Sequence, residues 1–175
     1  MKRNFVLMSL LVFFSLFLIG GAVPPPMAFA DSVVVEVSAV KANGLSLQNV
    51  RDLSFGELVT NQTTEISESS PNAGEVLVET SPDAPITVWF SASAGGAPTS
   101  QLTLTITGVG TDTMTATNMG VVVNSETAIG NEVNTFCDAD GNCSIFVIGE
   151  VTVGDDTVNP AGEYTGDAYI NVILG

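Results

Sequence analysis

Apolar and polar residues alternate in short runs along most of the chain, from residue 33 to the C-terminus. A two-residue period of this kind predicts β-strands, because successive side chains of a strand point to opposite faces. The first run, over residues 33–40, places four residues on its apolar face: Val33, Val35, Val37 and Ala39. The last run, over residues 164–174, has the same period, and no segment after Ala30 has a convincing helical one. The sequence therefore predicts an all-β fold.

Further runs lie between these two, and turn residues separate them. Phe55 is expected to fill the core within one of these strands, and Gly56 to form a bulge. Residues 75–80 and 86–90 are interpreted as two neighbouring strands, whereas residues 108–130 have a weaker pattern. About eight or nine short strands at this spacing predict an antiparallel β-sandwich of immunoglobulin or pilin type.

The N-terminus has the order of a secretory signal peptide. Basic residues precede an apolar run over residues 5–23, and the small residues Ala28 and Ala30 follow it. The run is also about long enough to span a bilayer, so a retained membrane anchor is the alternative. The small residues favour cleavage. The sequence thus predicts a signal peptide over residues 1–30 and a single β-sandwich domain over residues 31–175, exported to the periplasm, the cell surface or the medium.

Charge limits both the partners and the chemistry. The chain has 19 acidic residues, 4 basic residues, no histidine and a net charge of -15. Without residues 1–30, Lys41 and Arg51 are the only basic residues. Such an acidic surface repels nucleic acid and anionic lipid, so we expect no nucleic-acid partner and no membrane contact after signal cleavage. Because a general base would have to be a carboxylate and the acidic residues are dispersed, we predict no enzymatic activity and no cofactor.

The two cysteines, Cys137 and Cys143, are close in sequence. In an exported chain this spacing predicts a disulfide. The residues between them, 138–142, are typical of a turn, so we expect the disulfide to staple a β-hairpin whose strands lie on either side. A bridge across so short a loop should make the turn rigid more than it stabilises the fold.

The same turn contains the best candidates for a calcium site. Asp138, Asp140 and Asn142 present side-chain oxygens at alternate positions, and calcium prefers oxygen ligands. However, Cys143 and Gly149 stand where an EF-hand loop needs glycine and glutamate, respectively. Since Asp, Gly and Asn are also the common residues of turns, no metal site is predicted firmly.

Four short motifs follow one another along the domain: Leu53-Ser54-Phe55-Gly56, Asp138-Ala139-Asp140-Gly141, Val147–Val153 with Gly149 inside it, and Gly162-Glu163-Tyr164-Thr165-Gly166. In this order they resemble a bacterial exported family known as domain of unknown function 4402. The chain is also distantly similar to the spore coat U and secreted pilin group of fimbrial subunits. It departs from both patterns in its two cysteines and in ending with Leu174-Gly175 where relatives end with an aromatic residue.

The resemblance implies a sandwich that lacks one strand, which the N-terminal extension of a neighbouring subunit supplies. Residues 31–41, with Val33, Val35, Val37 and Ala39 as the inward residues, have the length and pattern of such a donor strand. The alternative, that they form the first strand of their own domain, stays open. The implied partners are copies of the same subunit and a periplasmic chaperone.

Three functional hypotheses follow from this sequence. The leading one is a pilin-like structural or adhesive subunit of the cell surface that assembles by β-strand donation. The second is a monomeric secreted module that binds a glycan or calcium, for which Trp89 would be an exposed aromatic platform. The third, and least favoured, is a hydrolase with paired carboxylates.

Overall fold

The computed structural model describes residues 29–41, 44–108, 111–155 and 158–175. Every regular element in these ranges is a β-strand, so the predicted all-β class is confirmed. No helix in this part of the chain is long and apolar enough to cross a membrane. In chain order the strands are β1 (Phe29–Lys41), β2 (Ser46–Arg51), β3 (Leu53–Val59), β4 (Thr63–Ile66), β5 (Gly74–Glu79), β6 (Pro85–Ser91), β7 (Leu102–Ile106), β8 (Thr113–Val123), β9 (Glu126–Ile129), β10 (Glu132–Phe136), β11 (Asn142–Thr152) and β12 (Tyr164–Leu174).

The predicted signal peptide lies almost entirely outside the described residues, since residues 1–28 are not among them. Its last two residues, Phe29 and Ala30, belong to β1 and pair with Val59 and Leu58 of β3. Cleavage after Ala30 would remove these pairs and leave the remaining pairs of β1 in place.

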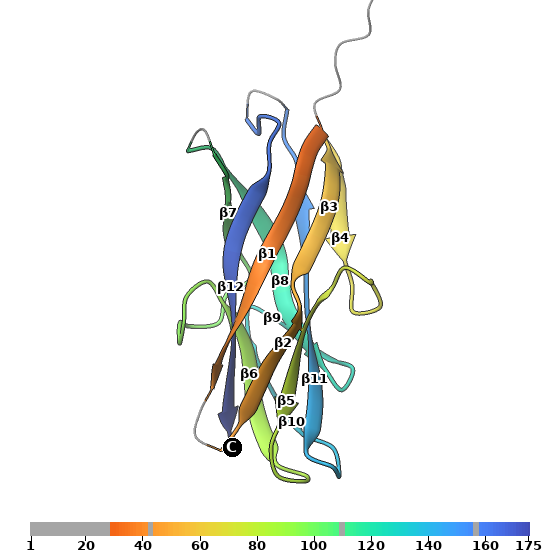
Figure 1. Cartoon of the computed structure of the whole chain (residues 1–175), viewed down its shortest axis with the longest axis vertical. Helices are drawn as coiled ribbons and strands as arrows, with labels where there is room; N and C mark the ends of the chain where they lie inside the picture. The colour runs from red at the N-terminus through yellow and green to blue at the C-terminus, as the bar shows by residue number, and fades with distance from the viewer. Residues whose placement is uncertain (1–28, 42–43, 109–110, 156–157) are drawn as a thin grey trace, which may run out of the picture.

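The strands form one hydrogen-bonded sheet that curls into a nearly closed barrel (Figure 1). One wall contains β10, β6, β12, β1 and β3, and the facing wall contains β9, β8, β11, β5, β4 and β2. β7 joins the walls, because it pairs with β12 at Tyr164 and Thr165 and with β8 along its length. The inward faces of both walls pack on a single apolar core, as in the predicted sandwich.

Two strands that the sequence suggested as neighbours lie in different walls. β5 pairs with β11 and β2, whereas β6 pairs with β10 and β12. The prediction that residues 75–80 and 86–90 are adjacent strands was therefore wrong. Alternation specifies which face of a strand is buried, but it does not specify the strand beside it. The connection between these two strands crosses from one wall to the other.

The weak pattern over residues 108–130 conceals β8, one of the longest strands of the described chain. Its inward residues change phase in the middle, from Met114 and Ala116 to Met119 and Val121. Asn118, between these pairs, has a φ of 49°, and the pairing of β8 with β11 shifts register at the same place. A bulge therefore interrupts the alternation that would have revealed the strand.

The predictions for Phe55 and Gly56 are confirmed. Phe55 is 3% exposed and belongs to the core. Gly56 has a φ of 67°, and the pairing between β1 and β3 shifts register where Val33 lies opposite Gly56 and Val34 lies opposite Ser54. The extra residue on β3 is a bulge that bends this strand along β1.

Tyr164, at the start of β12, has the geometry of a tyrosine corner, a motif of Greek-key sandwiches. Its side chain is fully buried, and its hydroxyl donates a hydrogen bond to the carbonyl oxygen of Pro160 at 3.0 Å. Burial raises the pKa of Tyr164 above its ordinary value, and the negative charge of Asp112 raises it further. The neutral hydroxyl therefore fixes the turn that leads into the last strand.

Replacing Tyr164 by Phe keeps the ring and removes this hydrogen bond, so we expect a loss of about 1 kcal/mol in the free energy of unfolding at neutral pH. The wild-type protein should lose stability as the pH rises above about 10, because the raised pKa makes the unfolded chain ionise first. The contribution of Tyr164 to this alkaline loss should be absent from Tyr164→Phe. Denaturant unfolding at neutral and alkaline pH measures both effects, and an identical alkaline profile in the variant would contradict the assignment. Tyr169→Phe, at a half-buried outward position, is the control.

Candidate functional site

The candidate donor strand, β1, fills a slot between β12 and β3 (Figure 1). It runs parallel to β12, with pairs from Val33 opposite Tyr164 to Lys41 opposite Val172. On its other side it runs antiparallel to β3 as far as Val35 opposite Leu53. In the single chain the N-terminal run is thus the first strand of its own domain.

The alternation of β1 places the predicted residues in the core. Val33 and Val35 are 0% exposed, Val37 is 2% exposed, and Ala39 is partly buried against the same cluster. Glu36, between them, faces solvent. Because burial of a valine side chain contributes about 1.5–3 kcal/mol, these residues make a large share of the interaction between the strand and the slot. Without β1, the slot would expose apolar surface between β3 and β12.

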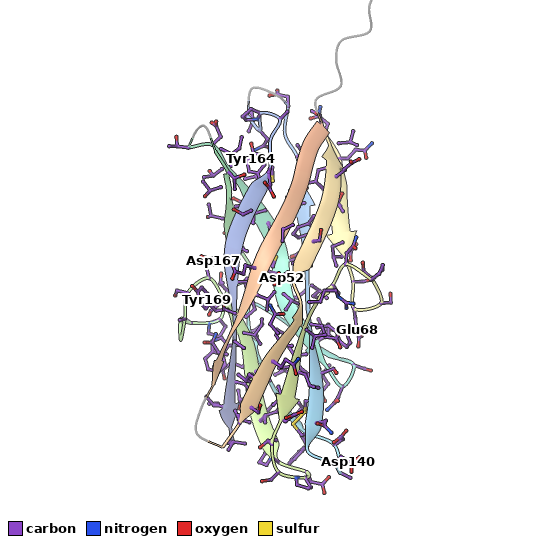
Figure 2. The ribbon with its side chains drawn as sticks, in the orientation of Figure 1. Asp52, Glu68, Asp140, Tyr164, Asp167 and Tyr169 are labelled. Atoms are coloured by element: carbon purple, nitrogen blue, oxygen red, sulfur yellow. A yellow bond between two sulfur atoms is a disulfide. The ribbon has the colours of Figure 1, made fainter. Side chains whose placement is uncertain are left out.

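The parallel pairing of β1 is an exception in this sheet, since all the other pairings among the described strands are antiparallel. It places the end of β1 beside the end of β12. Figure 2 shows the two ends of the barrel, with Tyr164 near one and Asp140 near the other. We call the end with Asp140, where β1 and β12 both finish, the C-terminal end. The sequence did not predict this polarity.

Beyond Val35, side chains replace β3 as the partner of β1. The backbone N–H of Val37 donates to Asp52 Oδ1 at 3.2 Å, and Asn49 Nδ2 donates to the carbonyl oxygen of Val37 at 3.0 Å. Asn49 also donates to Asp52 Oδ1 at 2.9 Å, which holds the two side chains together. The second half of β1 is therefore attached to this side of the slot by side chains, whereas its first half is attached by a strand.

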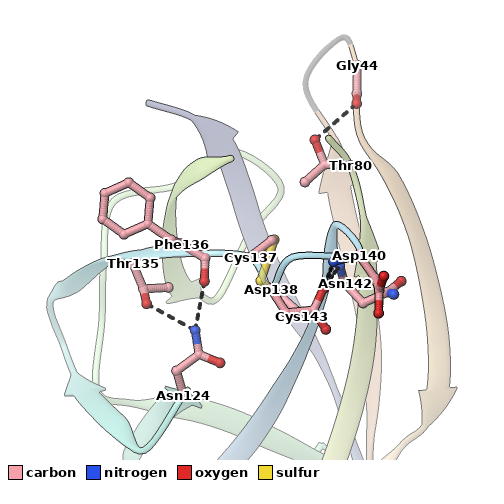
Figure 3. Close-up of a disulfide and its surroundings, with 10 residues drawn as sticks. All are labelled: Gly44, Thr80, Asn124, Thr135, Phe136, Cys137, Asp138, Asp140, Asn142 and Cys143. Atoms are coloured by element: carbon pink, nitrogen blue, oxygen red, sulfur yellow. Dashed lines mark hydrogen bonds between the residues drawn. A yellow bond between two sulfur atoms is a disulfide. The ribbon is translucent and has the colours of Figure 1, made fainter. Parts of the chain in front are cut away.

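The second predicted feature, the disulfide between Cys137 and Cys143, is present. Both cysteines are 3% exposed, and their Cα atoms are 5.0 Å apart. The expected hairpin is absent, because β10 and β11 do not pair with each other: β10 pairs with β6, and β11 pairs with β5, β8 and β4. The disulfide thus joins the two walls at the C-terminal end of the barrel (Figure 3). Turn residues between two alternating runs correctly indicate that the chain reverses there. They do not specify that the two strands pair, and these two strands pair in different walls.

The calcium candidates lie in the turn that this disulfide closes. Asp138, Asp140 and Asn142 are all exposed. Asp138 Oδ1 accepts hydrogen bonds from the backbone N–H groups of Asp140 at 3.0 Å and Asn142 at 2.7 Å (Figure 3). Across the described part of the chain, no group of three or more His, Cys, Asp or Glu side chains gathers in a way that could hold a metal ion. The geometry of Asp138 is that of a turn cap.

The aromatic platform considered for glycan binding also has an internal role. Trp89 is half-buried on β6, and its Nε1 donates to the carbonyl oxygen of Gly96 at 2.8 Å. The loop after β6 is thereby fixed against the indole. In contrast, Phe136, at the end of β10, is 63% exposed. The alternation of β10 places Phe136 on the outward face, but no other signal in the sequence marks it as functional.

Comparison with known proteins adds no family to this geometry. No protein-family model matches the chain, and no well-characterised protein matches it in sequence. The resemblance to domain of unknown function 4402 and to fimbrial subunits therefore stays a prediction from the residues.

If the disulfide mainly restrains a short loop, its removal should cost about 2 kcal/mol of unfolding free energy and leave the fold intact. The double variant Cys137→Ser with Cys143→Ser tests this expectation in denaturant unfolding, and wild-type protein treated with a reductant serves as the comparison. A chain that no longer folds would show that the bridge holds the walls together.

Two substitutions of Asp138 separate a turn cap from a calcium site. Asp138→Asn keeps an acceptor oxygen and should unfold like the wild type, whereas Asp138→Ala leaves two backbone donors without their acceptor and should lose about 1–2 kcal/mol. Neither difference should depend on calcium. Melting temperatures with calcium and with a chelator check this, and a calcium-dependent rise in the wild type that both variants abolish would instead support a metal site.

Proposed function

We propose that this protein is an exported structural or adhesive subunit of a bacterial cell surface that assembles with copies of itself by donating β1. One observation carries the proposal. An N-terminal strand with alternate buried valines, Val33, Val35 and Val37, occupies a slot between β3 and β12. After the proposed cleavage β1 would be terminal, and a terminal strand can leave such a slot without threading any other part of the chain through the fold.

Export and surface location are supported by the sequence. The signal-like order of residues 1–30 and the disulfide fit an oxidising compartment outside the cytoplasm. The excess of acidic over basic residues keeps such a domain soluble and away from nucleic acid and anionic lipid.

Donation of β1 to a copy would conserve nearly all of its contacts. The same valines would enter an identical slot, and the same backbone pairs with β12 would form. The equilibrium between a filled single chain and an exchanged assembly then depends mainly on protein concentration and on new contacts between copies.

A self-filled slot also bears on the proposed chaperone. The subunit can stay folded before assembly, because β1 covers the apolar surface between β3 and β12. A periplasmic chaperone would then be a partner of the subunit only while β1 is outside the slot. The glycan and calcium alternatives are less well supported, since Trp89 and Asp138 both have partners within the chain.

A peptide exchange experiment tests strand donation. The protein without its signal peptide, residues 31–175, is unfolded in denaturant without reductant. A labelled synthetic peptide of residues 31–41 is then added, and the mixture is refolded. The peptide should enter the slot and remain bound through gel filtration, because it carries the buried valines. A peptide with Val35→Asp should bind at least about tenfold less, since it would bury a charge, whereas Glu36→Ala, at an outward position, should bind like the original. Equal binding of all three peptides, or of none, contradicts donation.

A further inference from the structure

We infer that the C-terminal end of the barrel is the surface through which two copies meet, and that exchange of β1 with its present polarity closes a two-fold pair. This inference rests on the proposed strand donation and specifies its partner and stoichiometry. It follows from the polarity of β1, from the length of the chain after it, and from the residues exposed at this end.

The chain leaves the slot at the C-terminal end, where Lys41 lies opposite Val172 of β12. It enters the body of the domain at the same end, because β2 begins with Ser46 opposite Glu79, and the hydroxyl of Thr80 donates to the carbonyl oxygen of Gly44 at 3.4 Å. The mouth of the slot and the point where β1 is joined to the rest of its own domain therefore lie at the same end of each subunit.

The connection from Lys41 to Ser46 is short. A fully extended chain advances about 3.3–3.6 Å per residue, so the connection can span at most roughly 17 Å. If β1 of one copy fills the slot of another in the same direction, the two C-terminal ends must lie against each other. The second copy can then return its own β1 across the same two-fold axis, and both slots are filled.

A filament has a different requirement. Each copy in a filament must receive a strand at one end and donate its own strand at the other, so that the contacts repeat without closing. The parallel pairing of β1 with β12 places the mouth of the slot and the attachment of the donated strand at the same end of the barrel. A filament would need β1 to enter the slot in the opposite direction, antiparallel to β12.

The exposed apolar residues support a contact at the C-terminal end. Phe136 is 63% exposed, Ile173 44% and Leu174 38%, and each of them ends or nearly ends a strand there. The pairings of Phe136 with Pro85 and of Leu174 with Ile86 place them on the two strands that flank β6. Scattered apolar residues are normal on a surface, but these three lie at one end of one wall, with Ile173 and Leu174 on the strand that borders the slot and Phe136 two strands away from it. A second copy would cover them from water.

Charge at this end opposes the contact and makes it sensitive to salt. Asp138 and Asp140 are exposed in the turn beside Phe136 (Figure 3). In a two-fold pair these carboxylates would approach their own copies, and dissolved salt screens such repulsion between exposed charges. We therefore expect pairing to become stronger as the ionic strength rises.

Mixed cysteine variants test the polarity and the stoichiometry together. Ser38 lies opposite Tyr169 in the parallel register, so Ser38→Cys on one chain should form a disulfide with Tyr169→Cys on another when exchange occurs. The two exported variants are mixed, unfolded without reductant so that the native disulfide persists, refolded at high concentration and oxidised. We expect a cross-linked species whose mass, by light scattering, is that of two chains. Each variant alone is the control for cross-links that do not need the mixture.

The mixture of Glu36→Cys with Tyr169→Cys distinguishes the outcomes. In the parallel register Glu36 lies opposite Asp167, so this mixture should cross-link poorly. Efficient cross-linking of Glu36→Cys with Tyr169→Cys, or a ladder of species larger than two chains in either mixture, would contradict the closed two-fold pair. Strand donation itself would still be supported. If no mixture cross-links between chains, strand donation itself fails, and this inference fails with it.

A surface variant tests the contact without changing β1. Phe136→Asp should weaken pairing by about tenfold or more, as expected for an aromatic residue buried in an interface. Val158→Asp replaces a residue of similar exposure, 61%, that precedes the start of β12 at the other end of the barrel, and it should leave pairing unchanged. Equal pairing of both variants would show that the copies do not meet at the C-terminal end.

Discussion

The structure depends on the pairing of its first strand with its last. β1 and β12 are joined in parallel from Val33 and Tyr164 to Lys41 and Val172, and the inward valines of β1 complete the core between β12 and β3. This contact joins segments at opposite ends of the described chain, so it closes a very long loop and costs more chain entropy than the hairpin contacts of the barrel. We therefore expect β1 to dock after the rest of the barrel has formed. A strand that docks last on a formed body is also the one that exchanges most readily between copies.

Several features could be predicted because they depend on local periodicity. The alternation of β1 identified its inward residues, and Phe55 with Gly56 marked a core residue and a bulge. The pairing of the two cysteines followed from their spacing and the expected compartment. In contrast, the bulge at Asn118 shifts the alternation of buried residues along β8, so this strand does not show one continuous two-residue period. The separation of β5 from β6, and of β10 from β11, depends on long-range packing that no local pattern records.

Within the candidate site, too, some features follow from local periodicity and others depend on long-range packing. The inward face of β1 was visible in the sequence, but the slot that receives it and the direction in which it lies were not. The contacts of Asn49 and Asp52 with Val37 join positions that share no period, so they leave no pattern in the sequence. Asp138 shows the converse case. Oxygen-bearing side chains at alternate positions suggested a metal site, whereas the carboxylate of Asp138 turns back to two N–H groups of its own loop.

The position of the disulfide explains how the body could remain folded while β1 is outside the slot. The two walls are connected by β7, which pairs with β12 near Tyr164 at one end, and by the bridge between Cys137 and Cys143 at the other. Neither connection involves β1. The N–H of Cys137 also donates to the carbonyl oxygen of Ala84 at 3.0 Å, which fixes the bridge to the start of β6. Departure of β1 would thus open the slot along the side of the barrel while both ends of the walls stay joined. β3 would lose its strand partner, because among the described strands it pairs with β1 alone, and it would stay attached through the N–H of Ser54, which donates to the carbonyl oxygen of Asn72 at 3.0 Å. An incoming strand would therefore have to order β3 again as it docks, which costs part of the binding free energy.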